Sequence, residues 1–312
     1  MKTAIIGFGG MGCRHAYSLV KGNQFDEIYV VEPNKFLFLE NCKRIEIDNS
    51  FFIYLESIEE LPLNIDLVVI ATSAEPRFQI FEKISTKGVK YILLEKVVFQ
   101  KSSDFVKAIE ICKSKGISTY CNFVNRYYPN YIEIKERIGK AKNIQMIVSG
   151  GEYGLACNSL HYIDLFQYLT GLFPDLDSTL IQINNAKHKR GDNYKEVIGT
   201  LKISNKKGDS LVLISDLNKC NEVEISISFD NEIHILNEST LVHLTYKNQL
   251  PIEKKEFQIL YTSFLTNILS IDILNSDCKL PSIEETFKSH VELFKGLNSC
   301  FGLSELDNCP IT

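Results

Sequence analysis

The sequence lacks long hydrophobic runs and an excess of basic residues, and each absence removes a class of protein. Its longest apolar runs, such as LVVIAT and YILL, have the length of single strands and are far too short to cross a bilayer. The net charge is −5, and there is no Lys/Arg-rich run or base-stacking motif that would attract DNA or RNA. We therefore expect neither a membrane nor a nucleic acid as partner.

The sequence also lacks paired cysteines. Its nine cysteines are scattered, and none are spaced as C-x-x-C. This pattern argues against a disulfide framework and a zinc knuckle, so we expect no metal site and mostly reduced cysteines that pack as small hydrophobic residues. Near the N-terminus, glycines interrupt the apolar residues before the core of a signal peptide could form. We expect a cytoplasmic protein.

What the chain does have is size and an ordinary globular composition. Its 312 residues are 45% hydrophobic and 23% charged, without internal repeats or low-complexity segments. This length allows two domains and a substantial core. The pattern of the chain changes near its middle, and we expect a first domain over residues 1–122 and a second over 123–312.

The first domain opens with a glycine-rich turn between a β-branched run and a helical pattern. Gly7, Gly9 and Gly12 have the spacing GxGxxG. Gly7 would permit a tight turn, Gly9 would let a pyrophosphate approach the backbone, and Gly12 would let helix and strand pack closely. The helix that begins near Gly10 and Met11 would offer free N–H groups to the phosphates. The motif therefore predicts a dinucleotide site.

An acidic residue follows at the end of the second expected strand. Glu32 comes about 20 residues after the last glycine, where a carboxylate can hydrogen-bond ribose hydroxyls. It would also repel a 2′-phosphate, so NAD is favoured over NADP. Lys35 nearby weakens this preference and leaves NADP open. The alternative is that Glu32 is only a solvated carboxylate at a strand end.

Strands and helices then alternate. Strands are expected over 51–56, 66–73, 90–98 and from 118, with a short helix over 57–61 and longer ones over 75–88 and 102–116. Such alternation predicts a doubly wound parallel sheet, a Rossmann fold, which binds ligands outside the carboxyl ends of its strands. The residues at or beyond these ends are Thr72, Ser73, Glu95, Lys96, Asn122 and Arg126.

The second domain has a different pattern. Stretches with period-2 alternation and polar turns, over 143–150, 196–204, 210–216, 222–229, 232–236 and 240–246, predict a large, open, mainly antiparallel sheet. Helices are expected after His161 and over 257–274 and 282–297, which makes this an α+β domain. An exposed loop is expected over 184–193. A sheet with helices on one face leaves the other face free, and an apolar free face would suit a dimer.

With these motifs the chain resembles the Gfo/Idh/MocA oxidoreductases, a family of nicotinamide-dependent sugar and polyol dehydrogenases. The resemblance covers essentially the whole chain and rests on GFGGMG, ATSAEPR, EKVV, NRYYP, HYIDLFQYLTG and LPSIEETFKSH. It implies a Rossmann domain, a second domain with a large open sheet, and an active site between the two. It also implies a homodimer or homotetramer that acts on a sugar or sugar derivative.

The resemblance also implies the catalytic pair. The family's lysine in the Glu-Lys-Pro motif corresponds to Lys96, and its catalytic histidine corresponds to His161. A neutral histidine can take the hydroxyl proton as hydride leaves, and a lysine can stabilise the developing alkoxide. The expected cofactor contacts are Gly7, Gly9, Gly10, Met11, Gly12, Glu32, Thr72, Ser73, Glu95 and Lys96.

Three positions depart from the family pattern. Val97 replaces the proline after the lysine, Arg77 replaces a common histidine after the fourth strand, and Cys157 replaces an acidic residue four positions before His161. A Cys157 thiolate at a helix N-terminus could stand in for that carboxylate. We favour the alternative that Cys157 is a small packing residue.

The residues expected to contact the substrate are Asn122, Arg126, Tyr153, Cys157 and Asn158. Arg126 could instead pair with a carboxylate, and Asp164 would be a structural hydrogen-bond acceptor. Asn158 or Ser159 is expected to cap the helix that carries His161.

The favoured function is therefore an NAD(P)-dependent dehydrogenase or reductase acting on CH–OH groups. Two alternatives stay open. One is a non-catalytic sensor that binds dinucleotide and sugar, and the other is a Rossmann reductase with an imine or tetrapyrrole substrate.

Overall fold

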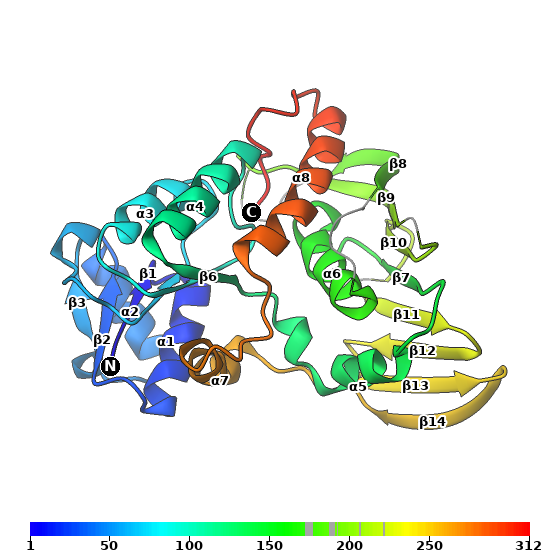
Figure 1. Ribbon diagram of the computed structural model, residues 1–312, viewed down its shortest axis with the longest axis horizontal. Helices are drawn as coiled ribbons and strands as arrows, with labels where there is room; N and C mark the ends of the chain where they lie inside the picture. Colours follow the sequence, from blue (N-terminus) through cyan, green and yellow to red (C-terminus); the bar gives the residue numbers. More distant parts are fainter. Residues whose placement is uncertain (172–176, 187–190, 192, 206, 221) are drawn as a thin grey trace. The chain divides into compact units, whose positions relative to one another are not determined.

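The chain divides into two compact units (Figure 1). The computed structural model describes all residues except 172–176, 187–190, 192, 206 and 221. The first unit comprises Met1–Val124 and Leu260–Glu284, and the second comprises Asn125–Ile259 and Glu285–Thr312. The first unit thus leaves off at Val124 rather than Asn122, and it takes up residues 260–284, which sequence order alone assigns to the second domain.

The first unit is built on a six-stranded parallel sheet in the order β3-β2-β1-β4-β5-β6. Strands β1, β4 and β5 are buried along almost their whole length, which explains their continuous apolar sequences. The predicted Rossmann sheet is confirmed. The strand order reverses beside β1 and β4, the point at which such sheets bind ligands. The strands are β1 (Lys2–Ile6), β2 (Glu27–Val31), β3 (Ile53–Leu55), β4 (Leu67–Ile70), β5 (Tyr91–Leu94) and β6 (Ser118–Cys121).

Helices connect these strands, as the alternating pattern predicted. They are α1 (Gly10–Gly22), α2 (Lys35–Arg44), α3 (Arg77–Ser85) and α4 (Ser102–Lys115), with 3₁₀ turns η1 (Asn49–Phe51), η2 (Ile58–Glu60) and η3 (Val124–Tyr127). The segment 57–61 forms only the short turn η2, although a capping box formed by Ser57 and Glu60 starts it as a helix would start.

Helix α7 (Thr262–Leu274) returns to the first unit and packs against α1. The buried ring of His15 on α1 places Nδ1 2.9 Å from the Thr266 hydroxyl, across a sequence separation of 251 residues. The side-chain amide of Gln24 donates to the Asn267 carbonyl at 2.7 Å and to the Ser270 hydroxyl at 2.8 Å. These buried polar contacts explain why the segment 260–284 belongs with the first unit.

The second unit contains an eight-stranded sheet in the order β14-β13-β12-β11-β7-β10-β9-β8. Only β7 and β10 run parallel to each other, so the mainly antiparallel sheet is confirmed. The strands are β7 (Gln145–Gly150), β8 (Asp177–Ala186), β9 (Glu196–Ser204), β10 (Ser210–Ser215), β11 (Glu224–Phe229), β12 (Glu232–Asn237), β13 (Val242–Lys247) and β14 (Leu250–Glu256).

Two edge strands were not expected. Strand β14, with the sequence LPIEKKE, is mostly exposed and carries charges on both faces, so it lacks the alternation of a half-buried strand. Strand β8 includes residues 184–186, where a loop was expected. Of the rest of that expected loop, residues 187–190 and 192 lie outside the described part of the chain.

The two faces of the second sheet differ. Helix α6 (Leu155–Thr170) packs against β9 and β10, and α5 (Pro129–Ile138) packs against α6; α8 (Ile283–Cys300) is the last helix. The buried face carries apolar residues such as Met146, Val148 and Leu213. The opposite face is also apolar in part, since Ile147 is 41% exposed and Ile233 is 36% exposed. Within the described residues, no helix is long and apolar enough to cross a membrane.

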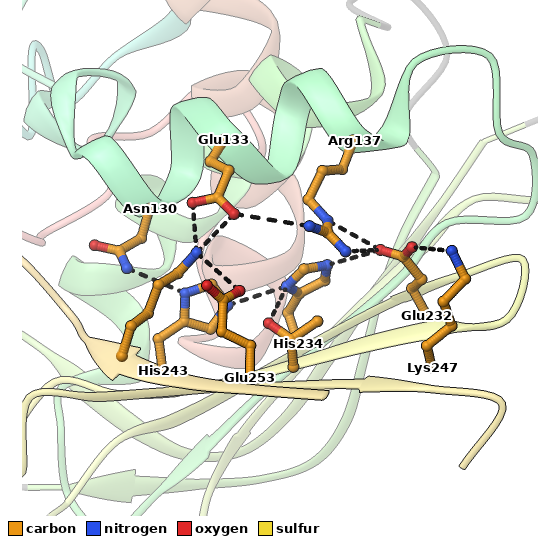
Figure 2. A network of polar contacts seen from close by, with 10 residues as sticks. Asn130, Glu133, Arg137, Glu232, His234, His243, Lys247 and Glu253 are labelled. Atoms are coloured by element: carbon orange, nitrogen blue, oxygen red, sulfur yellow. Dashed lines mark hydrogen bonds and ion pairs between the residues drawn. The ribbon is translucent and has the colours of Figure 1, made fainter. Parts of the chain in front are cut away.

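A polar network joins α5 to strands β12, β13 and β14 (Figure 2). Two buried rings face each other, with His234 Nδ1 3.0 Å from His243 Nε2, and the Asn130 amide nitrogen lies 3.1 Å from His243 Nδ1. Burial is the main reason that the pKa of each histidine falls to about 4, so both rings are neutral at pH 7. Because Asn130 can only donate through that nitrogen, His243 Nδ1 accepts and its Nε2–H donates to His234.

Ion pairs flank the two rings. The Lys255 ammonium contacts the Glu133 carboxylate on α5, and the Arg137 guanidinium lies 2.8 Å from the Glu232 carboxylate on β12. Lys247 reaches the same Glu232 carboxylate at 3.1 Å. These ion pairs tie helix α5 to the sheet on both sides of the two histidines.

Candidate functional site

The glycine turn of the first unit has the geometry that its sequence predicts. Strand β1 ends at Ile6, and Gly7 has φ of +89°, a left-handed conformation that favours glycine. A Cβ on Gly12 would lie 2.0 Å from the Gly7 carbonyl oxygen, so only glycine fits there. A Cβ on Gly9 or Gly10 would meet nothing within 4 Å. The backbone is therefore closely packed where Gly12 meets Gly7, and it is open to a ligand at Gly9 and Gly10.

The start of α1 is suited to bind a phosphate. Its N-cap is Gly9, which has no side chain to accept from the first N–H groups, and its first turn contains no acidic residue. Unsatisfied N–H groups at a helix start attract anions. The Thr72 hydroxyl, next to Gly7, is buried and has no hydrogen-bond partner among the described residues. The open backbone at Gly9 and Gly10, which we call the cradle, and the unpaired Thr72 hydroxyl together fit a dinucleotide.

Glu32 is tied to the glycine turn. Its Oε2 accepts a hydrogen bond from the Phe8 N–H at 3.0 Å, and its Oε1 accepts from the Asn34 N–H at 3.1 Å. A carboxylate has about four acceptor sites, so both oxygens can still accept ribose hydroxyls. Lys35 is exposed, with its ammonium 5.8 Å from the centre of the Tyr54 ring. Of these two charged groups, the Glu32 carboxylate is the one that backbone hydrogen bonds hold beside the glycine turn.

We expect NAD(H) to bind more tightly than NADPH by about tenfold or more, because Glu32 would face the 2′-phosphate and like charges repel. Fluorescence titration with both dinucleotides measures the ratio. Glu32→Gln should narrow the preference, whereas Lys35→Met, the matched control at the neighbouring exposed charge, should not. Tighter binding of NADPH to the unaltered chain would overturn the assignment of Glu32 to the ribose.

A buried carboxylate lies at the end of β5, immediately before Lys96. Glu95 is 6% exposed, and its Oε1 lies 2.9 Å from His15 Nε2 and 2.6 Å from the Asn122 amide nitrogen. Burial pushes the pKa of Glu95 upward, but His15, then Asn122 and the charge of Arg77, outweigh burial and lower the pKa to about 2. The group is therefore an ionised carboxylate that links α1, β5 and β6.

Arg77 holds the segment that carries Lys96. Its guanidinium is buried and donates to the backbone carbonyls of Glu95, at 2.5 Å, and of Val97 and Thr72. The peptide bond between Lys96 and Val97 is cis, a form otherwise almost confined to bonds before proline. Lys96 itself is half-buried. The remaining expected cofactor contacts are the half-buried Met11 and the exposed Ser73.

In the second unit, His161 lies half-buried on α6. The helix begins at Leu155 with Gly154 as N-cap, so the expectation that Asn158 or Ser159 caps it is wrong. The Asn158 amide instead donates to the Tyr153 carbonyl at 2.5 Å, and the Ser159 hydroxyl donates back to the Leu155 carbonyl. The helix therefore starts earlier than its local sequence suggests.

A residue that the sequence analysis missed explains this start. Glu196, the first residue of β9, is 8% exposed, and its Oε1 accepts from the Ala156 N–H at 2.5 Å and the Val197 N–H at 2.9 Å. A carboxylate at a helix N-terminus stabilises the helix through the dipole and through a charge-assisted bond. The cap is 40 residues away in sequence and belongs to no motif.

Three polar side chains converge on Gly154, whose φ is +88°. A Cβ at Gly154 would lie 3.1 Å from Cys157 Sγ, 3.1 Å from the Asn158 amide nitrogen and 3.2 Å from Glu196 Oε2. Beside them, the Tyr153 hydroxyl is buried without a hydrogen-bond partner in the described part of the chain. Burial, and secondly the charge of Glu196, raise the pKa of Tyr153, so this phenol stays neutral.

Arg126 and Asp164 form a buried ion pair. The Arg126 Nε lies 2.9 Å from Asp164 Oδ2, and its NH2 nitrogen lies 2.6 Å from Oδ1, a bidentate arrangement. Burial raises the pKa of Asp164 to about 6 against the opposing charge of Arg126, and the pair is ionised at pH 7. Of the two roles considered for Arg126, the structure shows the pairing with a carboxylate.

The expected residues thus form two groups, one in each unit. Around the glycine turn lie Gly7, Gly12, Glu32 and Thr72, while the second group gathers around Gly154. Lys96 belongs to the first unit and His161 to the second. Within the described residues, no three His, Cys, Asp or Glu side chains are placed to hold a metal ion.

A comparison with known proteins covers the part of the chain that contains the first of these groups. Residues 1–123 match the family described as "Oxidoreductase family, NAD-binding Rossmann fold", GFO_IDH_MocA. The match covers the sheet, the glycine turn, Glu32 and Lys96. The family binds NAD, so NAD is the cofactor that this cradle fits.

Three solved structures share the fold. UDP-N-acetylglucosamine 3-dehydrogenase GnnA from Acidithiobacillus ferrooxidans is 15% identical with a TM-score of 0.73, covering 95% of this chain and 96% of its own. A super-repressor mutant of Gal80p from Saccharomyces cerevisiae is 14% identical with a TM-score of 0.74, covering 97% and 96%. Biliverdin reductase from Synechocystis, in complex with biliverdin and NADP+, is 15% identical with a TM-score of 0.72, covering 93% and 95%. At this identity the likenesses show the fold.

Proposed function

We propose that the chain transfers a hydride between nicotinamide and a CH–OH or ketone carbon of a sugar or sugar derivative, because residues 1–123 match the model of the NAD-binding Rossmann fold of an oxidoreductase family. The observation that carries the proposal is the open cradle over Gly9 and Gly10, with Glu32 anchored beside it. NAD, when bound, supplies the redox chemistry, and the protein supplies position and proton transfer.

Two residues are proposed to act on the substrate. In the oxidation direction His161 takes the proton of the substrate hydroxyl as the C–H bond releases its hydride. Lys96 donates a hydrogen bond to the same oxygen and stabilises the negative charge that develops on it. The position of Lys96, two residues beyond the end of β5 at the carboxyl edge of a parallel sheet, supports this role.

The substrate contacts are proposed from the groups around these residues. They are Asn122, Tyr153, Cys157 and Asn158, while Arg126 is taken up by its ion pair with Asp164. The unpaired, buried hydroxyl of Tyr153 supports its inclusion, because a sugar hydroxyl would satisfy it. The fold shared with a UDP-N-acetylglucosamine dehydrogenase favours a sugar derivative within this class.

Turnover of a panel of sugars, sugar phosphates and nucleotide sugars, followed by NADH absorbance, tests the proposal. We expect oxidation of at least one member with NAD, and none without added dinucleotide. A biliverdin arm and an imine arm belong in the same panel. Reduction in those arms, with no oxidation of any sugar, would assign the chain to another class of substrate.

A sensor without turnover is the second candidate. It is favoured by Cys157, which stands where the resemblance leads one to expect an acidic residue, and by the fold shared with Gal80p. Calorimetry on the same panel separates the two, because a sensor would bind dinucleotide and sugar without forming NADH. Retention of both Lys96 and His161 makes us prefer the enzyme.

We also propose a homo-oligomer, a dimer or a tetramer, formed through the outer face of the second sheet. The apolar side chains on this face include Ile147 and Ile233. Exposed apolar patches of this kind mark interfaces, and closed symmetric assemblies are the rule. Light scattering at micromolar concentration should give a multiple of the chain mass, and Ile147→Asp should lower it. A monomeric unaltered chain would contradict the proposal.

A further inference from the structure

Glu196 has one carboxylate oxygen that the helix cap does not use. Its Oε1 accepts both backbone hydrogen bonds, from Ala156 and Val197. Its Oε2 accepts none within the described residues, although the side chain is 8% exposed. The cap uses only one of the two carboxylate oxygens, so the second oxygen is left to accept from another group.

The free oxygen lies on the helix face that carries His161. Oε2 and Cys157 Sγ lie 3.2 Å and 3.1 Å from the same point, the Cβ position of Gly154, so the two atoms are near neighbours. Cys157 and His161 are four residues apart on α6, and such residues share one helix face. Side chains on a helix also lean toward its N-terminus. By this rule we expect the His161 ring to lean toward the turn where Oε2 lies.

From this geometry we propose that Glu196 is the carboxylate partner of His161 and acts as a positioning residue for hydride transfer. The inference rests on the proposed function. The acidic group that position 157 lacks would thus come from strand β9 instead of from α6. Cys157 then needs no charge, in agreement with its interpretation as a small packing residue.

The chemistry of the step favours such a partner. In the oxidation direction the substrate C–H bond breaks and its electron pair leaves with the hydride for NAD, while the hydroxyl proton moves to His161. The ring then carries a positive charge. A carboxylate beside it stabilises that charge and holds the ring in one orientation and tautomer. Glu196 orients the ring and takes no part in the proton transfer itself.

The competing explanation is that Glu196 only caps α6. Glu196→Gln separates the two, because the amide oxygen can still accept from the Ala156 N–H while the charge is lost. We expect kcat to fall by about 10²-fold or more, since orientation of a catalytic histidine by a carboxylate has effects of this size or larger. The NAD affinity and KM should change little, and the Tm should fall only slightly, because the amide keeps the hydrogen bond of the cap and loses only its charge. Glu152→Gln, an exposed carboxylate in the preceding loop, is the matched control and should leave kcat unchanged.

A second variant restores a carboxylate from helix α6 instead of from strand β9. Cys157→Asp in the Glu196→Gln background should recover kcat to within about tenfold of the unaltered chain, because it returns a carboxylate to the same turn. A cap has no such requirement, so the capping explanation predicts neither the loss nor the recovery. Unchanged kcat in Glu196→Gln, or a loss that Cys157→Asp does not recover, would overturn the proposal.

A measurement without turnover tests the geometry by itself. A carboxylate beside Cys157 disfavours the thiolate, and the thiolate is the form that alkylating reagents attack. Iodoacetamide should therefore modify Cys157 severalfold faster in Glu196→Gln than in the unaltered chain, as followed by mass spectrometry of the peptide. An unchanged rate would contradict the placement of Oε2 beside the thiol. If the unaltered chain turned over no substrate, the proposed function would fail together with this inference, whereas active chains with equal kcat would overturn the inference alone.

Discussion

Lys96→Met and His161→Ala should each lower turnover by about 10²–10⁴-fold, the usual contribution of one positioned acid, base or charge-stabilising group. Each variant should keep nearly the same affinity for NAD, because the cradle of the cofactor is formed by the glycine turn and Glu32. Steady-state rates with the substrate identified from the panel, together with fluorescence titration of NAD, measure both quantities.

Lys90→Met serves as the control for the lysine. Lys90 is exposed and precedes β5 at its amino end, so its loss removes the same charge far along the strand from Lys96. It should leave turnover within about twofold, as for most surface substitutions. Near-normal turnover in both Lys96→Met and His161→Ala would refute the mechanism proposed for this chain.

Gly12→Ala should destabilise the chain by about 3 kcal/mol or more, or prevent it from folding, because overpacking against fixed backbone is costly. The added methyl group would lie 2.0 Å from the Gly7 carbonyl oxygen, and neither β1 nor α1 can move without disturbing the parallel sheet. Thermal unfolding followed by circular dichroism measures the loss.

Gly9→Ala is the matched variant in the same motif. Gly9 has φ of −75°, which alanine can adopt, and its Cβ would meet nothing within 4 Å. We therefore expect an unchanged Tm and an NAD affinity at least about tenfold weaker, because the methyl group would occupy the space of the pyrophosphate. Normal NAD binding by Gly9→Ala would mean that no phosphate approaches the backbone at this glycine.

The sequence predicted the parts of the molecule that local physics determines. The turn at Gly7 and Gly12 could be located because a positive φ and a close helix–strand contact each demand glycine. Strands β7 and β9–β13 of the second sheet could be located because alternation follows directly from one buried face. Strand β14 could not, since an exposed edge strand with charges on both faces has no such pattern.

Long-range contacts account for the other differences. Helix α6 begins at Leu155, ahead of the expected caps, because Glu196 from another strand accepts from Ala156. Nothing near Leu155 in the sequence signals that carboxylate. Arg77 likewise has the sequence context of an ordinary residue at a helix start. Its guanidinium nevertheless donates to the carbonyl oxygens of Glu95 and Val97, on either side of Lys96. Because every residue has a carbonyl oxygen, no sequence pattern signals such a contact.

The discontinuous first unit has a consequence for the order in which the molecule is made. A ribosome completes all six strands of the first sheet by Cys121, but the hydroxyl that faces His15 arrives only with Thr266. Until then α1 exposes the surface that α7 covers in the finished unit, and a buried histidine lacks one of its two partners. The second unit is largely synthesised in that interval. The first unit is therefore begun before the second but can be completed only after most of the second has been synthesised. A gene fragment that ends at residue 124 would encode the parallel sheet without helix α7.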